Sequence, residues 1–313
     1  MRRVLVVLAF LTTTTTVTAA RADDADDRCA VRIKRQLDAG ALPRARRTLD
    51  RCARRSPTDS RWAHLVAIWI PTDLDRLEAP DEALREDLSR ARALADAAPD
   101  ATLDRERAWW RFLADGVFEL EIGPQDSAGV ALLRRVAALA WRRGRLEDAE
   151  RALRRAYRVM PQDPDTARDL AALLVARGRA EESVALLGNV RAAHPADREL
   201  KREHALALLA AGRGDDALVI LEALARDDDG GVDTLRLASA ALELGDATRA
   251  EAAARRALER LDAPRAPEAH AVRGLALLAL GRRDEAREAL RLGSDDLRAR
   301  SALAALDSGG TTP

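Results

Sequence analysis

The sequence is poor in residues whose types and spacing support catalysis. Its histidines are His64, His194, His204 and His270. They form neither a His-Glu-x-x-His motif nor a pair at positions i and i+4, which a zinc site on one helix face requires. The sequence also lacks a Cys-x-x-Cys pair, a Gly-x-Ser-x-Gly motif and a Walker A loop. We therefore expect no enzyme activity, no resident metal and no cofactor.

Three adjacent carboxylates, Asp227, Asp228 and Asp229, are the remaining group with ligand chemistry, because calcium is bound by carboxylate oxygens. They precede the Gly230-Gly231 pair, and aspartate with glycine is typical of a turn. We interpret the cluster as a solvated loop and keep a weak calcium site as the alternative.

The two cysteines suit a structural disulfide. Cys29 and Cys52 stand eleven residues before and twelve residues after the middle of a predicted helical turn at 38–42. In an antiparallel hairpin, residues equidistant from the turn lie side by side, so the two sulfur atoms can meet. Disulfides persist in exported proteins, whereas two buried free thiols are the alternative.

The first 22 residues have the features of an export signal. Arg2 and Arg3 precede an apolar stretch at 4–11, and residues 20–22 read Ala-Arg-Ala just before Asp23. The apolar stretch is too short to span a bilayer. We therefore expect a cleaved signal and a periplasmic or secreted mature protein, and keep an uncleaved membrane anchor as the alternative.

The composition favours helices. Hydrophobic residues make up 47% of the chain but aromatic residues only 3%, so the core must be built from alanine, leucine and valine. We predict an all-α fold. Acidic and basic residues number 52 each and are interleaved along the predicted helices. This pattern indicates solvated faces with i,i+4 ion pairs rather than a nucleic-acid surface.

A pattern of turn glycine, small residue and apolar residue recurs at a nearly constant interval. The glycines, spaced by 34, 34, 33 and 36 residues, are Gly144, Gly178, Gly212, Gly245 and Gly281. The small residues five positions later are Ala149, Ser183, Ala217, Ala250 and Ala286. An apolar residue stands nine positions after each glycine, and Pro161 and Pro195 close the first two units.

Each of these positions has a mechanical role. Glycine can adopt the left-handed conformation that ends a helix, and the polar residues after it turn the chain. The small residue lets a second helix cross close to the first. A single hairpin of this kind cannot bury both of its apolar faces, whereas stacked hairpins bury them against one another. The pattern therefore predicts a row of stacked helical hairpins.

This unit resembles the tetratricopeptide repeat. The resemblance covers five units at 130–292 and reappears near the N-terminus in Gly40, Ala45, Leu49, Cys52 and Pro57. It implies a right-handed α-solenoid. The large aromatic residue usual in the first helix of the family is replaced by Leu133, Ala167, Lys201, Thr234 and His270, which leaves the curvature open. His204 falls at a normally apolar position, where we expect a hydrogen-bonded or partly exposed side chain.

The predicted organisation follows from these segments. It comprises a signal peptide at 1–22, an N-terminal hairpin at 23–57, irregular helical repeats at 58–129, five repeats at 130–292, a cap helix at 293–308 with Ser294 as its N-cap, and a disordered tail at 309–313. Further helices are predicted at 59–70, 81–97, 101–121 and 127–143. We expect Trp109 and Trp110 to pack in the core rather than form a contact patch.

The resemblance also implies a binding surface, because the first helices of such repeats line a concave groove that holds partner segments. The corresponding positions here are Arg134, Arg135, Trp141, Arg168, Asp169, Arg202, Glu203, Arg236, Ser239 and Glu243. Arginine and tryptophan dominate binding interfaces, so we expect an acidic partner segment with one apolar side chain. The alternative is that the arginines are ordinary surface charges and Trp141 fills the core.

These features together predict a non-catalytic protein–protein interaction scaffold of the cell envelope. The alternatives are an accessory subunit of an envelope enzyme or assembly complex, and a membrane-tethered structural spacer. A glycan-binding module would need exposed aromatic side chains in the groove, where only Trp141 is available. We expect no nucleic-acid partner and no membrane insertion after signal cleavage, and the partner and oligomeric state stay open.

We predict that the mature chain begins at Asp23, because the small residues before it suit signal cleavage. N-terminal sequencing of the protein recovered from cells measures this directly. A chain that keeps Arg2 and Arg3 and stays in the membrane fraction would contradict the prediction and favour the tethered spacer.

Overall fold

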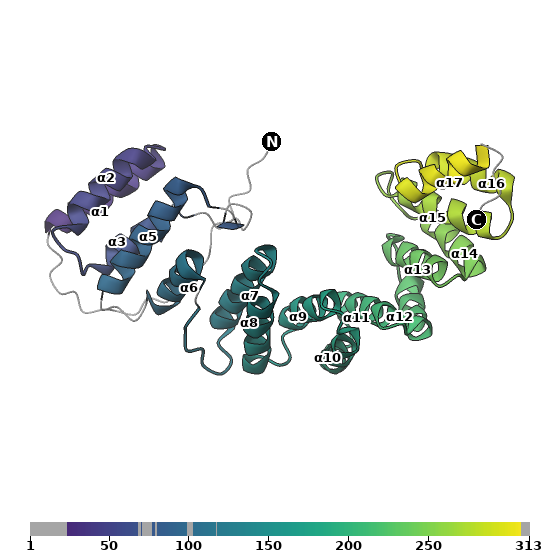
Figure 1. Ribbon diagram of the computed structural model, residues 1–313, viewed down its shortest axis with the longest axis horizontal. Coiled ribbons are helices and arrows are strands. Elements are labelled where there is room, and N and C mark those ends of the chain that lie inside the picture. The colour runs from purple at the N-terminus through teal and green to yellow at the C-terminus, as the bar shows by residue number, and fades with distance from the viewer. Residues whose placement is uncertain are drawn as a thin grey trace. The chain divides into compact units, whose positions relative to one another are not determined.

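The computed structural model describes residues 24–67, 70, 77–78, 80–98, 103–116 and 118–307. These residues form sixteen helices and no strand (Figure 1), which confirms the predicted all-α class. Within this part of the chain, no helix is both long and apolar enough to cross a membrane. The predicted signal peptide at 1–22 and the tail at 309–313 lie outside the described residues.

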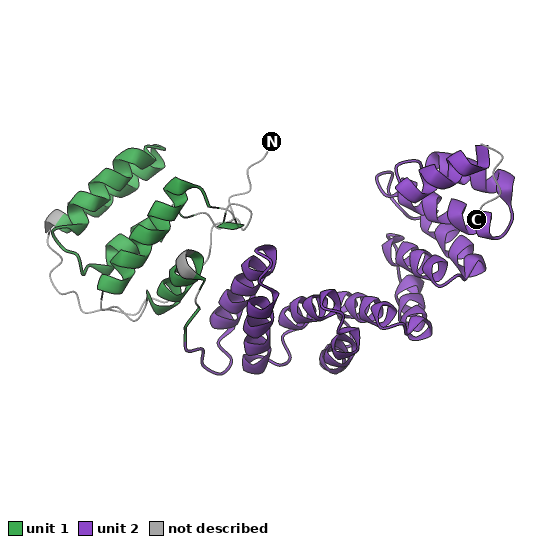
Figure 2. Cartoon of the chain, viewed as in Figure 1, with its two compact units in different colours: residues 1–120 green, residues 121–313 purple. Residues whose placement is uncertain are grey.

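The first of two compact units, residues 1–120 (Figure 2), contains a disulfide-bonded hairpin. Helices α1 (Asp24–Asp38) and α2 (Leu42–Ala53) pack against each other, and Gly40 in their turn has a φ of 69°. A disulfide joins Cys29 to Cys52, whose Cα atoms are 6.4 Å apart. The predicted pairing is therefore confirmed.

Three further helices of this unit follow the hairpin, and the first and last of them carry the aromatic side chains that are buried among its described residues. They are α3 (Ser60–Ala67), α5 (Glu82–Ala97) and α6 (Asp104–Asp115). The helix predicted at 101–121 ends at residue 115 because Gly116 adopts a left-handed φ of 73°. Trp62, Trp109 and Trp110 are buried, which confirms the core interpretation of the tandem tryptophans, whereas Trp69 lies outside the described residues.

The second unit, residues 121–313, is a row of helical hairpins. Its helices are α7 (Ser127–Arg142), α8 (Leu146–Val159), α9 (Pro164–Ala176), α10 (Ala180–Ala193), α11 (Arg198–Ala210), α12 (Gly214–Arg226), α13 (Val232–Glu243), α14 (Ala247–Leu258), α15 (Ala266–Ala279), α16 (Arg283–Leu292) and α17 (Leu297–Asp307). Each helix packs against the next one along the chain (Figure 1). The pairs from α7–α8 to α15–α16 are the five predicted repeats.

The turn glycines and small residues of these repeats have the predicted geometry. The φ angles are 71°, 73°, 74°, 81° and 77° at Gly144, Gly178, Gly212, Gly245 and Gly281. The small residues five positions later, Ala149, Ser183, Ala217, Ala250 and Ala286, are all 0% exposed. Complete burial at these positions is what a close crossing between the two helices of a hairpin requires.

Gly293 shows how close two helices come in the last hairpin. A Cβ atom at Gly293 would lie 2.4 Å from the backbone nitrogen of Ala271 in α15. No side chain fits at that distance, so this position requires glycine. The neighbouring Leu290 of α16 is fully buried and fills the adjacent space.

Helix α17 covers the apolar end of the last hairpin. Its residues Ala299 and Leu306 join a buried cluster with side chains of α15 and α16. The carboxylate of Asp296 accepts the backbone N–H of Ala299 at 3.2 Å. The prediction that Ser294 caps this helix is therefore wrong, because the helix begins three residues later and Asp296 occupies the capping position.

We expect the variant Gly178→Ala to lower the free energy of unfolding by about 1 kcal/mol, because the left-handed conformation is unfavourable for alanine. No atom lies within 4 Å of a Cβ at this position, so the effect measures the backbone alone. Urea unfolding followed by circular dichroism gives the change.

Gly188→Ala is the matched control. Gly188 lies inside α10, where a Cβ would make an ordinary 3.8 Å contact with the His204 ring. Alanine should raise stability there by up to about 1 kcal/mol through its helix propensity. Equal effects of the two variants would contradict the left-handed role of the turn glycine.

Candidate protein-binding groove

Three first helices form the face on which the predicted groove residues stand. Helix α7 contacts α9, and α9 contacts α11. Each of them begins at an aspartate whose carboxylate accepts a backbone N–H three residues later, namely Asp126, Asp163 and Asp197. These caps satisfy amide groups that the helix itself leaves without partners.

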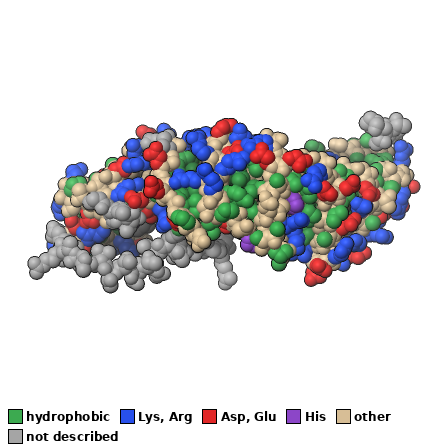
Figure 3. All heavy atoms as spheres, turned by 90° about the horizontal axis from the view of Figure 1, so that it is seen from below, with side chains coloured by type: hydrophobic (Ala, Val, Ile, Leu, Met, Phe, Trp, Pro, Cys, Tyr) green, Lys and Arg blue, Asp and Glu red, His purple; other side chains and the backbone are tan. Residues whose placement is uncertain are grey.

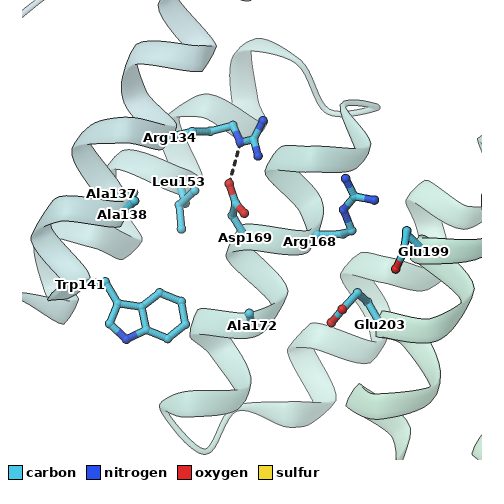
Figure 4. A pocket seen from close by; sticks show the side chains of 10 residues that line it. All are labelled: Arg134, Ala137, Ala138, Trp141, Leu153, Arg168, Asp169, Ala172, Glu199 and Glu203. Carbon is cyan, nitrogen blue, oxygen red and sulfur yellow. Dashed lines mark hydrogen bonds and ion pairs between the residues drawn. The ribbon is translucent and has the colours of Figure 1, made fainter. Parts of the chain in front are cut away.

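A pocket of about 480 Å³ opens on this face (Figure 4). It is lined by Arg134, Ala137, Ala138, Trp141, Leu153, Arg168, Asp169, Ala172, Glu199 and Glu203. Trp141 of α7 lies on one side of Ala172 in α9, and Glu199 and Glu203 of α11 lie on the other side (Figure 4). The pocket therefore combines an aromatic side chain, a floor of small apolar residues and a carboxylate wall.

Half of the residues predicted for the groove line this pocket. They are Arg134, Trp141, Arg168, Asp169 and Glu203. The others, Arg135, Arg202, Arg236, Ser239 and Glu243, do not line it. Arg236 and Glu243 are exposed on α13 and Ser239 is half-buried there. Arg135 is half-buried on α7, and burial lowers its pKa.

The pocket arginines are held by carboxylates of α9, which lie on the neighbouring helix for Arg134 and on the same helix for Arg168. Nε of Arg134 donates to Asp169 at 2.6 Å and Nη1 donates to Asp165 at 2.9 Å. Burial acts to lower the pKa of Arg134, but the hydrogen bonds and charges of these two carboxylates outweigh it and raise the pKa. Arg168 also forms an ion pair with Asp165. These contacts link α7 to α9 and orient both arginines along the pocket wall.

Arg202 has a similar partner one repeat further on. Asp233 at the start of α13 is 0% exposed and accepts hydrogen bonds from Arg202 at 2.5 and 2.9 Å and from Arg198 at 2.6 Å. The hydrogen bond to Asp233 is the largest cause of the raised pKa of Arg202. Arg202 therefore joins α11 to α13, and its Nη1 also donates to Glu199 at 2.5 Å, so its charge is used within the protein.

Glu199 was missed by the sequence analysis although it lines the pocket. It precedes Glu203 by four residues on α11, and residues four apart share a helix face. The i,i+4 rule applied to Glu203 would have found it. The alanines were missed because small residues carry no chemical signal in the sequence, and only the neighbouring helices show that they form a floor.

Surface charge elsewhere is mixed. Positive and negative side chains are interspersed on the face shown in Figure 3. Many of the arginines form ion pairs three or four residues apart on one helix, such as Arg154 with Glu150 and Arg151 with Asp148. This agrees with the interpretation of the arginines as partners of nearby acids.

The aspartate cluster after α12 has a structural role. Asp228 is buried and accepts hydrogen bonds from the backbone N–H and the hydroxyl of Thr234, at 2.7 and 2.9 Å. In the described part of the chain, no group of three or more His, Cys, Asp or Glu side chains is placed to hold a metal ion. The calcium alternative for this turn therefore has no geometric support.

The side chain of His204 is more buried and less hydrogen-bonded than we expected from the sequence. It is 7% exposed, and its Nδ1 atom is buried without a hydrogen-bond partner. Burial is the largest cause that lowers its pKa, and together with the charges of Arg191 and Arg213, and against the opposing charge of Asp216, it brings the pKa to about 4. The side chain is therefore neutral at pH 7 and fills an otherwise apolar position of α11.

Comparisons with known proteins agree with this architecture. The tetratricopeptide repeat family model matches residues 140–207, from the end of α7 into α11. A tetratricopeptide repeat protein from Parabacteroides merdae is 13% identical, and the match covers 90% of this chain and 97% of that one with a TM-score of 0.50. No curated protein matches the sequence.

Two further solved structures are similar over a smaller part of the chain. MamA protein is 16% identical, with coverage of 59% of this chain and 97% of that one and a TM-score of 0.45. A thermophilic tetratricopeptide repeat protein from Thermus thermophilus is 22% identical, with coverage of 57% and 99% and a TM-score of 0.44. On the family match and the P. merdae structure, the chain is a tetratricopeptide-like helical repeat protein.

We predict that stability falls as the pH is lowered from about 6.5 to about 4, with His204 as one source of the loss. The folded pKa lies below the ordinary value, so between these limits the unfolded chain binds a proton that the folded chain does not. The full loss from this residue is about 3 kcal/mol.

The variant His204→Leu should have a smaller loss of unfolding free energy between neutral and acidic pH than the wild type. His194→Gln is the control, because His194 is only half-buried and its Nε2 lies 2.8 Å from the Gln162 carbonyl. Urea titrations across this range measure both. An unchanged pH dependence in His204→Leu would contradict the prediction.

Proposed function

We propose that the protein is a non-catalytic scaffold that holds a segment of another protein in the groove formed by α7, α9 and α11. The observation that carries the proposal is the pocket in which the half-buried Trp141 stands beside small residues and charged side chains of three consecutive repeats. Tetratricopeptide proteins bind other proteins or peptides, and the fold and family match support the same general role here.

The groove is suited to binding because it is formed before any partner arrives. Arg134 ties α7 to α9, while Arg198 and Arg202 tie α11 to α13. A surface held by such contacts loses little conformational freedom on binding, which favours affinity. Trp141 has the size and partial exposure of an anchor residue, and tryptophan is enriched at the energetic centres of interfaces.

A location in the cell envelope is part of the proposal. It is supported by the export-type sequence at 1–22 and by the disulfide between Cys29 and Cys52, which suits an oxidising compartment. An accessory subunit of an envelope enzyme or assembly complex is the alternative, and it differs in the identity of the protein that is bound.

Site-specific photocrosslinking in cells tests the groove. A benzoylphenylalanine at Ala172, which is exposed on the pocket floor, should crosslink the chain to a discrete partner protein. The same group at Ala192, exposed on the second helix α10, should not give that product. The crosslinked band is identified by mass spectrometry.

Two outcomes would contradict the proposal. One is an identical crosslinking pattern from Ala172 and Ala192, and the other is the absence of any product from Ala172 while both variants accumulate to the wild-type level. A product that contains an envelope enzyme would support the accessory-subunit alternative.

A further inference from the structure

Among the residues that the structure describes, the charged side chains around the pocket are paired with one another except at one position. Arg134 and Arg168 pair with Asp165 and Asp169. Arg198 and Arg202 pair with Asp233 and Glu199. Of the charged side chains that line the pocket in the described structure, Glu203 is the one that takes part in no ion pair or hydrogen bond.

The neighbours of Glu203 leave its charge uncompensated. Lys201 is two positions away on α11, and residues two apart do not share a helix face. Arg236, the exposed arginine of α13, also forms no ion pair with any residue that the structure describes. Glu199 lies one turn before Glu203 on the same face, but its charge is paired with Arg202 and does not offset that of Glu203. The α11 side of the pocket therefore attracts a cation.

The opposite side of the pocket is apolar and aromatic. Trp141 and Ala138 come from α7, and Ala172 lies between them and the carboxylates of α11 (Figure 4). An indole face attracts cations as well as apolar groups. The volume of about 480 Å³ falls in the range of sites that enclose a small group of atoms, such as one or two side chains.

From this arrangement, and resting on the proposed function, we propose that the bound segment presents a lysine or arginine next to a large apolar residue. The basic side chain reaches Glu203, whose charge has no partner within the protein, and the apolar residue packs on Trp141 and the alanine floor. The expected charge of the partner segment is therefore opposite to the acidic charge predicted from the sequence. That prediction assumed that the arginines of α7, α9 and α11 are available to a partner.

An acidic segment fits the pocket less well. To reach Arg134 or Arg168 it would compete with Asp165 and Asp169, which already lie at hydrogen-bonding distance on α9. It would also bring a negative charge close to Glu203. A basic segment can direct its charge at Glu203, which has no internal ion pair to break. It therefore gains an interaction without the loss of another.

Selection from a displayed library of random dodecapeptides tests the chemistry directly, with the purified disulfide-bonded chain as bait. Peptides enriched on the wild type should carry Lys or Arg beside Leu, Ile, Phe or Trp. Binding of the leading synthetic peptide is then measured by fluorescence anisotropy. Replacement of its basic residue by glutamine should weaken binding about fivefold or more.

Matched variants of the chain locate the interaction. Glu203→Gln should weaken the peptide about fivefold, and Trp141→Ala about thirtyfold, with partial recovery in Trp141→Phe. Glu181→Gln is the control, because Glu181 is exposed on the second helix α10. Circular dichroism and thermal melts identify any variant whose loss reflects unfolding, and the isosteric glutamine variant keeps the test valid if Trp141→Ala is unstable.

The results separate this inference from the proposed function. Enrichment of acidic peptides that fail to bind Arg134→Gln or Arg168→Gln would overturn the basic-segment inference and leave the scaffold intact. Peptides insensitive to both Glu203→Gln and Trp141→Ala would also overturn it, as would no enrichment over the double variant Glu199→Lys, Glu203→Lys. The scaffold itself is judged by the crosslinks from Ala172.

Discussion

The close crossing of two helices at a residue of minimal volume is the interaction on which the second unit depends. At Ala149 and its equivalents the side chain is completely buried, and at Gly293 even a Cβ would collide with the backbone of the partner helix. This approach accompanies the burial of the apolar residues nine positions after each turn glycine, which are leucine in four repeats and Ala254 in the fourth of the five. Because few aromatic residues are available, such short helix–helix distances are how alanine and leucine form a dense core.

Ion pairs between the first helices of successive repeats also fix the positions of these helices. Arg134 contacts two aspartates of α9, and Asp233 of α13 holds two arginines of α11 from a fully buried position. A buried carboxylate is tolerated because its hydrogen bonds replace those lost with water. These arginines therefore maintain the spacing of the repeats. In the pocket on α7, α9 and α11, this network leaves the charge of Glu203 uncompensated among the described residues.

Most charged side chains of this face form contacts within the fold, and the few that do not are left for the binding that we propose. A scaffold needs a surface that keeps its shape in the absence of a partner, and the caps, turn glycines and inter-repeat ion pairs provide it. In the binding mode that we propose, recognition depends on the few side chains that those contacts do not use, with Trp141 and Glu203 on opposite sides of a floor of alanines (Figure 4). Shape and charge complementarity are sufficient for this role, and it requires no reactive group.

The helical class, the repeat period, the turn glycines, the buried small positions and the pairing of Cys29 with Cys52 could all be predicted from the sequence, because each depends on contacts at fixed separations along the chain. Half of the groove residues followed from the same periodicity. Only the tertiary structure showed that Arg202 is directed to Asp233, that His204 is buried without a partner for Nδ1, and that Asp296 caps the last helix. These outcomes depend on which side chain of a neighbouring helix is close enough to accept a hydrogen bond, and periodicity places a residue on a face without choosing its partner.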